Sequence, residues 1–243
     1  GYLYSVSGLY GGTSLFRSSK SLTGETKTAY DLIVPMIESV ANGTEKSAEF
    51  TLTSAAWDRT PEDWGFSTPI TYPQNESLPK DVVDAISAKF DMNALFHRLL
   101  SDLPYHLYWF DKSAEGSFSM GVSLNYSATS GGTTNTVTKI TATVEIKMKV
   151  SKDYAVDGVE NTYKVNNRPT RVATAVAEAG KVVSDNASKN DYNKLVAYLE
   201  YIKTAVSYNK TAAETTNHPY GDPWQLIYVF DGDSTTNVVC EGY

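Results

Sequence analysis

The sequence predicts an α+β fold: an antiparallel sheet with packed helices, followed by a helical region. Two long segments in the middle of the chain alternate between apolar and polar residues, which is typical of strands with one buried face. Segments with apolar residues at helical spacing stand before and after them. Strands and helices that pack face to face around one core define this class.

The first expected helix runs from about Lys27 to Ala41, because its apolar residues recur on one face. Asn42 and Gly43 end it in the manner of a C-terminal cap. Pro35 lies inside the segment and predicts a kink or a broken turn.

A short strand is expected at Phe50 and Leu52, which alternate with polar residues. The turn-rich stretch from Trp57 to Leu78 follows, and we expect Trp57 and Trp64 to anchor it to the body of the protein. The stretch is therefore predicted to be a loop whose aromatic residues pack against the rest of the protein.

Two consecutive helices are expected between Pro79 and Leu100, because the apolar face shifts near Asp91. The aromatic segment Tyr105–Phe110 that follows them favours a strand.

The strongest pattern is the hairpin formed by the strands 117–126 and 136–150, which a Gly-rich loop at 129–133 connects. Alternation over such long runs predicts that one face of the hairpin is buried against the helices. The buried face is expected to carry the even-numbered apolar residues, among them Val144, Ile146 and Met148.

The chain becomes helical again after the polar loop 153–167, with helices expected at 169–187 and at 191–207, the second capped by Asp191. A third, short helix is expected from Trp224 to Phe230. We therefore divide the chain into an N-terminal α+β module, 1–165, and a second domain, 166–243. The two longer helices are expected to pack through two apolar stripes, Val172/Val176/Val183 and Leu195/Leu199/Ile202.

Composition excludes several classes of function. The chain of 243 residues carries a net charge of −7 with a pI near 5.0, whereas nucleic-acid binding needs clustered Lys and Arg. No apolar run approaches the roughly 20 residues that a membrane-spanning helix requires. Polar loops over a core rich in tyrosine and poor in cysteine favour an exported bacterial protein, and no signal peptide opens the chain. We expect an extracellular or cell-surface location.

Few residues of the sequence are candidates for catalysis or for binding a cofactor or metal. The sequence has neither a dinucleotide-binding nor a phosphate-binding glycine motif, and no Gly-x-Ser-x-Gly segment. Its three histidines, His97, His106 and His218, are too scattered for a metal site. We expect no cofactor and no metal, which leaves the single cysteine, Cys240, as the candidate catalytic residue.

The residues around Cys240 resemble those of a known family. The segment Val238–Tyr243, Val-Val-Cys-Glu-Gly-Tyr, is similar to the nucleophile signature of the bacterial transglutaminase-like proteins, which have a papain-like fold. Three further segments agree: a helix end of the form Ile-x-x-x-Val-x-Tyr at 202–208, a short helix at 222–230, and an aromatic segment at 107–111. The resemblance covers roughly residues 191–243 specifically and the preceding part only diffusely.

The resemblance implies a secreted or surface-type cysteine acyltransferase or peptidase, whose substrate is a protein or peptide amide such as a cell-wall peptide. It places Cys240 at or near a helix N-terminus, where the helix dipole favours the thiolate. The family's histidine base and its Asp or Asn follow the cysteine, whereas this chain stops three residues after Cys240. The second domain would then be the helical half of a truncated transglutaminase-like domain, inactive by itself, with Val238 and Val239 exposed.

An alternative from another class stays open: a non-catalytic cell-surface module that recognises protein or glycan. Its binding surface would use the aromatic residues of 57–64 and 105–110, although such residues also serve as core.

Overall fold

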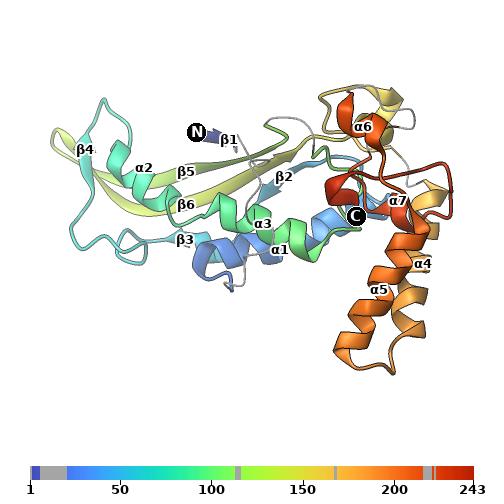
Figure 1. The fold of residues 1–243 in the computed structure, drawn as a ribbon. Helices are drawn as coiled ribbons and strands as arrows, with labels where there is room; N and C mark the ends of the chain where they lie inside the picture. The colour runs from blue at the N-terminus through green and yellow to red at the C-terminus, as the bar shows by residue number, and fades with distance from the viewer. Residues whose placement is uncertain (1, 6–20, 113–115, 167–168, 216–220, 222) are drawn as a thin grey trace. The chain divides into compact units, whose positions relative to one another are not determined.

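The computed structural model describes residues 2–5, 21–112, 116–166, 169–215, 221 and 223–243 (Figure 1). Helices and an antiparallel sheet build this part of the chain, which confirms the α+β class. The chain divides into two compact units, each made of segments that are distant in sequence. The sheet unit comprises 1–37, 48–102 and 114–148, and the helical unit comprises 38–47, 103–113 and 149–243. Their boundaries differ from a division at residue 165, which stays a prediction.

The hairpin of strands β5 (Phe118–Gly131) and β6 (Thr134–Met148) dominates the sheet unit (Figure 1). The strands run closer to the turn than expected, because residues 129–131 pair with 134–136 and only Gly132 and Thr133 remain between them. Gly132 has a φ of +66°, which glycine adopts at little cost. The remaining strands are β1 (Tyr2–Ser5) on β5, and β2 (Glu49–Leu52), β3 (Asp58–Arg59) and β4 (Thr71–Pro73) on β6.

The alternation along β6 is confirmed. Val144, Ile146 and Met148 have no exposed surface, whereas the odd-numbered residues between them are partly or fully exposed. The same face continues along β5 through the buried Met120 and Val122. The predicted strand at Phe50 and Leu52 is β2, and it buries both of these side chains.

Three helices belong wholly or mainly to the sheet unit: α1 (Gly24–Ala41), α2 (Lys80–Ser87) and α3 (Met92–Asp102). The helical assignment of α1 is unbroken across Pro35, so the predicted broken turn is absent from this helix. The apolar residues around the proline, Ile33 and Ile37, are fully buried, and this packing holds the helix together. The division into α2 and α3 near Asp91 is confirmed, and Asp91 caps α3 by accepting a hydrogen bond from the Ala94 N–H at 2.9 Å.

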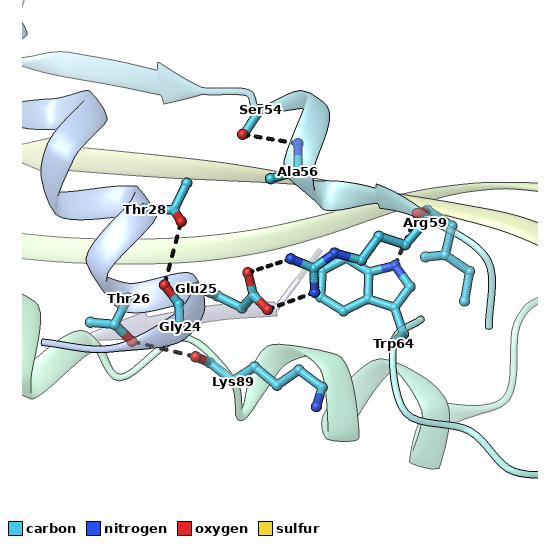
Figure 2. A network of polar contacts seen from close by, with 10 residues as sticks. Gly24, Glu25, Thr26, Thr28, Ser54, Ala56, Arg59, Trp64 and Lys89 are labelled. Atoms are coloured by element: carbon cyan, nitrogen blue, oxygen red, sulfur yellow. Dashed lines mark hydrogen bonds and ion pairs between the residues drawn. The ribbon is translucent and has the colours of Figure 1, made fainter. Parts of the chain in front are cut away.

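Trp57 and Trp64 anchor the turn-rich stretch, as expected, since both are buried in the core of the sheet unit. The Trp64 indole N–H donates to the carbonyl of Ile140 on β6 at 3.0 Å. The Arg59 guanidinium lies 4.7 Å from the Trp64 ring centroid and donates two hydrogen bonds to the Glu25 carboxylate, at 2.7 and 3.1 Å (Figure 2). One polar network thus ties α1 to the strand β3 and the loop after it.

The segment Tyr105–Phe110 is not the strand that its aromatic residues favour. It forms consecutive turns in which the N–H of Leu107 bonds to Leu103 and that of Phe110 bonds to Leu107. Only Phe110 forms a strand-like bridge, with Val150. Burial of the side chains of residues 107–110 overrides their preference for strand backbone.

The helical unit contains α4 (Thr170–Asp185), α5 (Asp191–Ala205), α6 (Lys210–Glu214) and α7 (Ile227–Phe230). The cap of α5 is Asn190 rather than Asp191, because the Asn190 side chain accepts from the N–H of Asn193. The third expected helix begins at Ile227, three residues later than predicted, and Gly232 follows it with a φ of +75°.

Helices α4 and α5 form a hairpin (Figure 1). Of the predicted stripes, Val172 is buried and Ile202 packs against the core of the helical unit, but the other members are exposed. Leu195 and Leu199 are 68% and 55% exposed, and Val176 and Val183 are 40% and 56% exposed. The Tyr201 ring instead stacks on Phe230, and its hydroxyl donates to Glu178 of α4 at 3.2 Å. These contacts turn the face that contains Tyr201 inward, and the predicted leucines therefore lie on the surface.

Candidate nucleophile site at Cys240

Cys240 follows a short stretch of paired backbone in the helical unit. Tyr208 and Val238 form a parallel bridge, in which the N–H of Asn209 donates to the Val238 carbonyl at 2.9 Å. The Asn237 side chain accepts from the backbone N–H of Ser207 at 2.9 Å. These bonds join the chain after α5 to the chain that leads to the cysteine, although about thirty residues separate them.

The backbone before Cys240 rests on an apolar cluster. Val238 is fully buried together with Val206, Tyr228 and Val229, and Ile202, Ala205 and Phe230 pack against them. Val239 is also buried, and its N–H donates to the carbonyl of Pro223. The expectation that Val238 and Val239 are exposed is therefore wrong: α5 and α7 already supply the residues that cover them.

Cys240 opens a tight turn. The residue has a φ of +29°, which is uncommon outside glycine, and its side chain is exposed. It begins the 3-10 turn η4 (Cys240–Gly242), closed by a hydrogen bond of 2.7 Å from the Gly242 N–H to the Val239 carbonyl. The resemblance implied a helix N-terminus at this position, and the structure shows a single turn of three residues. Backbone strain and exposure, rather than a long helix dipole, characterise the cysteine here.

Gly242 is required by the close approach of its neighbours. A Cβ atom at this position would lie 2.6 Å from the Cβ of Val238 and 2.8 Å from the carbonyl oxygen of Pro223. Distances below 3.0 Å are not tolerated by real Cβ atoms, and both neighbours belong to the packed base of the site. The turn that presents Cys240 therefore closes only around glycine.

Tyr208 is the side chain that contacts the thiol. Its hydroxyl lies 3.7 Å from the Cys240 Sγ, within hydrogen-bond distance for sulfur. The hydrogen bond to Cys240 is the main cause that raises the pKa of the Tyr208 phenol above its ordinary value. The Tyr243 ring stacks beside Tyr208 with a centroid distance of 6.4 Å, and its hydroxyl donates to the Val206 carbonyl at 3.3 Å. The two rings form one wall of the site.

Tyr208 was not predicted as a site residue, although it is the last residue of the helix-end motif at 202–208. The parallel bridge to Val238 brings it to the cysteine, and no local pattern reveals that pairing. A tyrosine directly after the apolar end of a helix, thirty residues before the cysteine, was the available signal.

The histidines do not complete a dyad among the described residues. His106 is exposed on the turn that precedes Leu107, and His97 lies on α3 in the sheet unit. His218 lies outside the described residues. Within the described part of the chain, the polar partner of the Cys240 thiol is the Tyr208 hydroxyl.

The aromatic stretches do not provide the surface that a binding module would use. Trp57, Trp64, Trp109 and Phe110 are each at most 1% exposed. They serve as core, which is the other use that the sequence allowed for them.

The described residues offer neither a metal-binding cluster nor a helix that could span a membrane. No group of three or more His, Cys, Asp or Glu side chains among them could hold a metal ion. None of the described helices combines the length and the apolar character needed to cross a membrane.

Comparison of the chain with protein-family models, with characterised proteins and with solved structures found no match.

Proposed function

We propose that Cys240 is the nucleophile of a secreted, transglutaminase-like cysteine acyltransferase or peptidase that acts on protein or peptide amides. The observation that carries the proposal is the exposed Cys240 thiol on a strained turn, with the Tyr208 hydroxyl 3.7 Å from its Sγ. The motif around Cys240 supports the same assignment. The buried aromatic stretches leave the alternative, a recognition module, without its expected surface.

The chemistry requires a thiolate. The Cys240 Sγ attacks the carbonyl carbon of the amide and forms a C–S bond, and the tetrahedral intermediate then expels the protonated amine to leave a thioester. An amine or water attacks the thioester and regenerates the thiol, which gives acyl transfer or hydrolysis. Tyr208 can donate its O–H to the thiolate in the resting state. The proton that the leaving amine needs must come from a general acid, and the described residues place no histidine beside the thiol.

Two substrates test the nucleophile and the general acid separately. An activated ester, such as a p-nitrophenyl ester of an acylated amino acid, has a good leaving group and acylates a competent thiolate without acid assistance. A glutamine-containing peptide needs a general acid to release ammonia. We expect the ester to acylate the 243-residue chain once, at Cys240, and the peptide amide to give no turnover.

Intact-mass and peptide-mass spectrometry locate the acyl group. Cys240→Ala should abolish the adduct, whereas the matched variant Tyr192→Phe, at an exposed position of α5, should leave it unchanged. Acylation elsewhere, or amide turnover that survives Cys240→Ala, would show that the nucleophile has been assigned to the wrong residue.

A further inference from the structure

Among the described residues, one edge of β5 lacks a partner strand along residues 123–131. β1 pairs with β5 only along four residues, where Tyr2 faces Val122 and Ser5 faces Ser119. From Ser123 to Gly131, the partner of β5 among the described residues is β6 on its other side. The backbone N–H and C=O groups that point outward along this stretch form a template on which another strand can pair.

A groove lies beside this open edge. It has a volume of about 470 Å³ and is lined by Leu78, Pro79 and Val83 from the start of α2 and by Val122, Leu124 and Tyr126 from β5. The three β5 residues belong to the apolar face that is buried farther along the hairpin, but here this face is only partly buried. Val122 is buried, Leu124 is half-buried and Tyr126 is 37% exposed.

Backbone pairing and an apolar groove together specify the ligand class. A strand that adds to an open edge gains main-chain hydrogen bonds, and every second side chain points to the same face of the sheet. Leu124 on this face of β5 and Val83 of α2 both line the groove. A glycan could use the groove but has no regular backbone to pair with the edge.

The rim adds a charge preference. Glu76 and Lys80 both line the groove, and the Lys80 ammonium is paired with the Asp84 carboxylate. Glu76 is exposed, and the whole chain carries a net charge of −7. In the bound peptide, a basic residue next to the apolar residue is therefore favoured over an acidic one.

We propose that the open edge of β5 at residues 123–131 and the groove beside it bind an extended peptide segment as an added β-strand, with an apolar side chain in the groove and a Lys or Arg facing Glu76. This site lies within the sheet unit and does not depend on Cys240 or on its proposed chemistry.

The experiment uses the full chain and a library of fluorescein-labelled heptapeptides. Threonine occupies alternate positions, and the positions between are varied over Val, Leu, Phe, Lys and Glu. Fluorescence anisotropy should select members that combine apolar residues with Lys, and replacement of that Lys by Glu should weaken binding at least tenfold.

Backbone methylation tests the binding mode. The best peptide is made in two N-methylated forms, with methyl groups on the odd-numbered or on the even-numbered amides. A strand that pairs along one edge uses only one of these sets, so one form should lose binding at least tenfold and the other should keep it. Hydrogen exchange of the amides of residues 123–131 should slow down when the unmethylated peptide binds.

Variants of the protein test the groove. Leu124→Glu should weaken binding at least tenfold, whereas Val159→Glu, at an exposed position of the helical unit, should not change it. Tyr126→Ser, at a more exposed lining position, tests the groove again if Leu124→Glu alters the circular dichroism of the protein. The proposal is overturned if no library member binds with a dissociation constant below about 1 mM. It is equally overturned if neither methylated form loses binding, or if an oligosaccharide occupies the groove and the peptides do not.

Discussion

The partly buried ion pair between Arg59 and Glu25 offers a quantitative test of the sheet unit. The Glu25 side chain is only 11% exposed and that of Arg59 is 27% exposed, and two hydrogen bonds of 2.7 and 3.1 Å join them. Arg59→Met removes the cation and leaves the carboxylate in its place, with the Trp64 ring also losing its cationic neighbour (Figure 2). Breaking a fully buried pair in this way costs about 3–5 kcal/mol. Since a quarter of the Arg59 side chain reaches water, we expect a loss of about 2–3 kcal/mol in the free energy of unfolding.

A double-mutant cycle isolates the pair. The cycle compares Arg59→Met, Glu25→Gln and the double variant, and the double variant should be less destabilised than the sum of the two single variants by about 1–3 kcal/mol. The reason is that Glu25→Gln removes the charge that Arg59→Met would strand. Lys147→Met is the matched control on the same sheet, because its pair with Glu49 is 40% and 47% exposed and should contribute less than about 1 kcal/mol.

Urea unfolding with hydrogen exchange read on peptides of α1 and β3 assigns the free energies to the sheet unit. Losses that add within about 0.5 kcal/mol in the double variant would refute the reasoning. So would a Lys147→Met loss as large as that of Arg59→Met, because the cost would then not depend on burial.

The remaining predictions concern the core, the nucleophile turn and pH. Ile146→Ala, at a fully buried position, should cost about 2–5 kcal/mol in urea unfolding, whereas Glu145→Ala next to it should change the stability by less than about 0.5 kcal/mol; equal losses would contradict the alternation. Gly242→Ala should destabilise the helical unit by about 1–3 kcal/mol and change the alkylation rate of Cys240 by iodoacetamide, because the new Cβ displaces the turn; an unchanged rate and midpoint would show that Val238 yields without cost. Burial raises the pKa of Asp231 above its ordinary 3.8, so the folded state holds this proton more tightly, and the group's contribution to stability is present below pH 3.8 and lost as the pH rises through the folded pKa. Asp231→Asn should therefore flatten the decline of the melting temperature above pH 3.8, and parallel curves for the two proteins would contradict that cause.

The sequence predicted those elements whose burial is periodic. The β5–β6 hairpin has one core face along most of its length, so Val144 and Ile146 reveal it by their spacing. The strands β3 and β4 have two and three residues, too few for any period, and they exist because β6 extends far enough to pair with them. Their formation depends on tertiary context that no local window contains.

Helix α5 shows why a correct helix can be assigned a wrong face. Its sequence offers two faces: one with Leu195 and Leu199, and one with Ala197 and Tyr201. Hydrophobicity favours the leucine face, but the contacts of Tyr201 with Phe230 and Glu178 favour the other face. The spacing of apolar residues sets the helix, whereas specific partners set its rotation.

The candidate site was predictable only in part. Cys240 could be chosen because it is the only cysteine of the chain and lies in a recognisable motif. Its contact with Tyr208 depends on a parallel bridge across thirty residues, and the turn that it begins packs Gly242 against Val238. Both arise from the return of the chain to the end of α5, which is a tertiary event.

The strand β6 also has a consequence for the order in which the chain can acquire structure during synthesis. Four other strands depend on the β5–β6 pair, and Leu52 of β2 finds its partner at Val144, 92 residues later. At about 5–20 residues per second, a ribosome needs about 5–20 s to make that interval. Phe50 and Leu52, which are buried in the folded sheet unit, are therefore synthesised well before the strand with which β2 pairs. Chaperones that bind nascent apolar segments are therefore expected to bind this region. Their binding should end when the whole of β6, up to residue 148, has left the ribosome and can pair with β2.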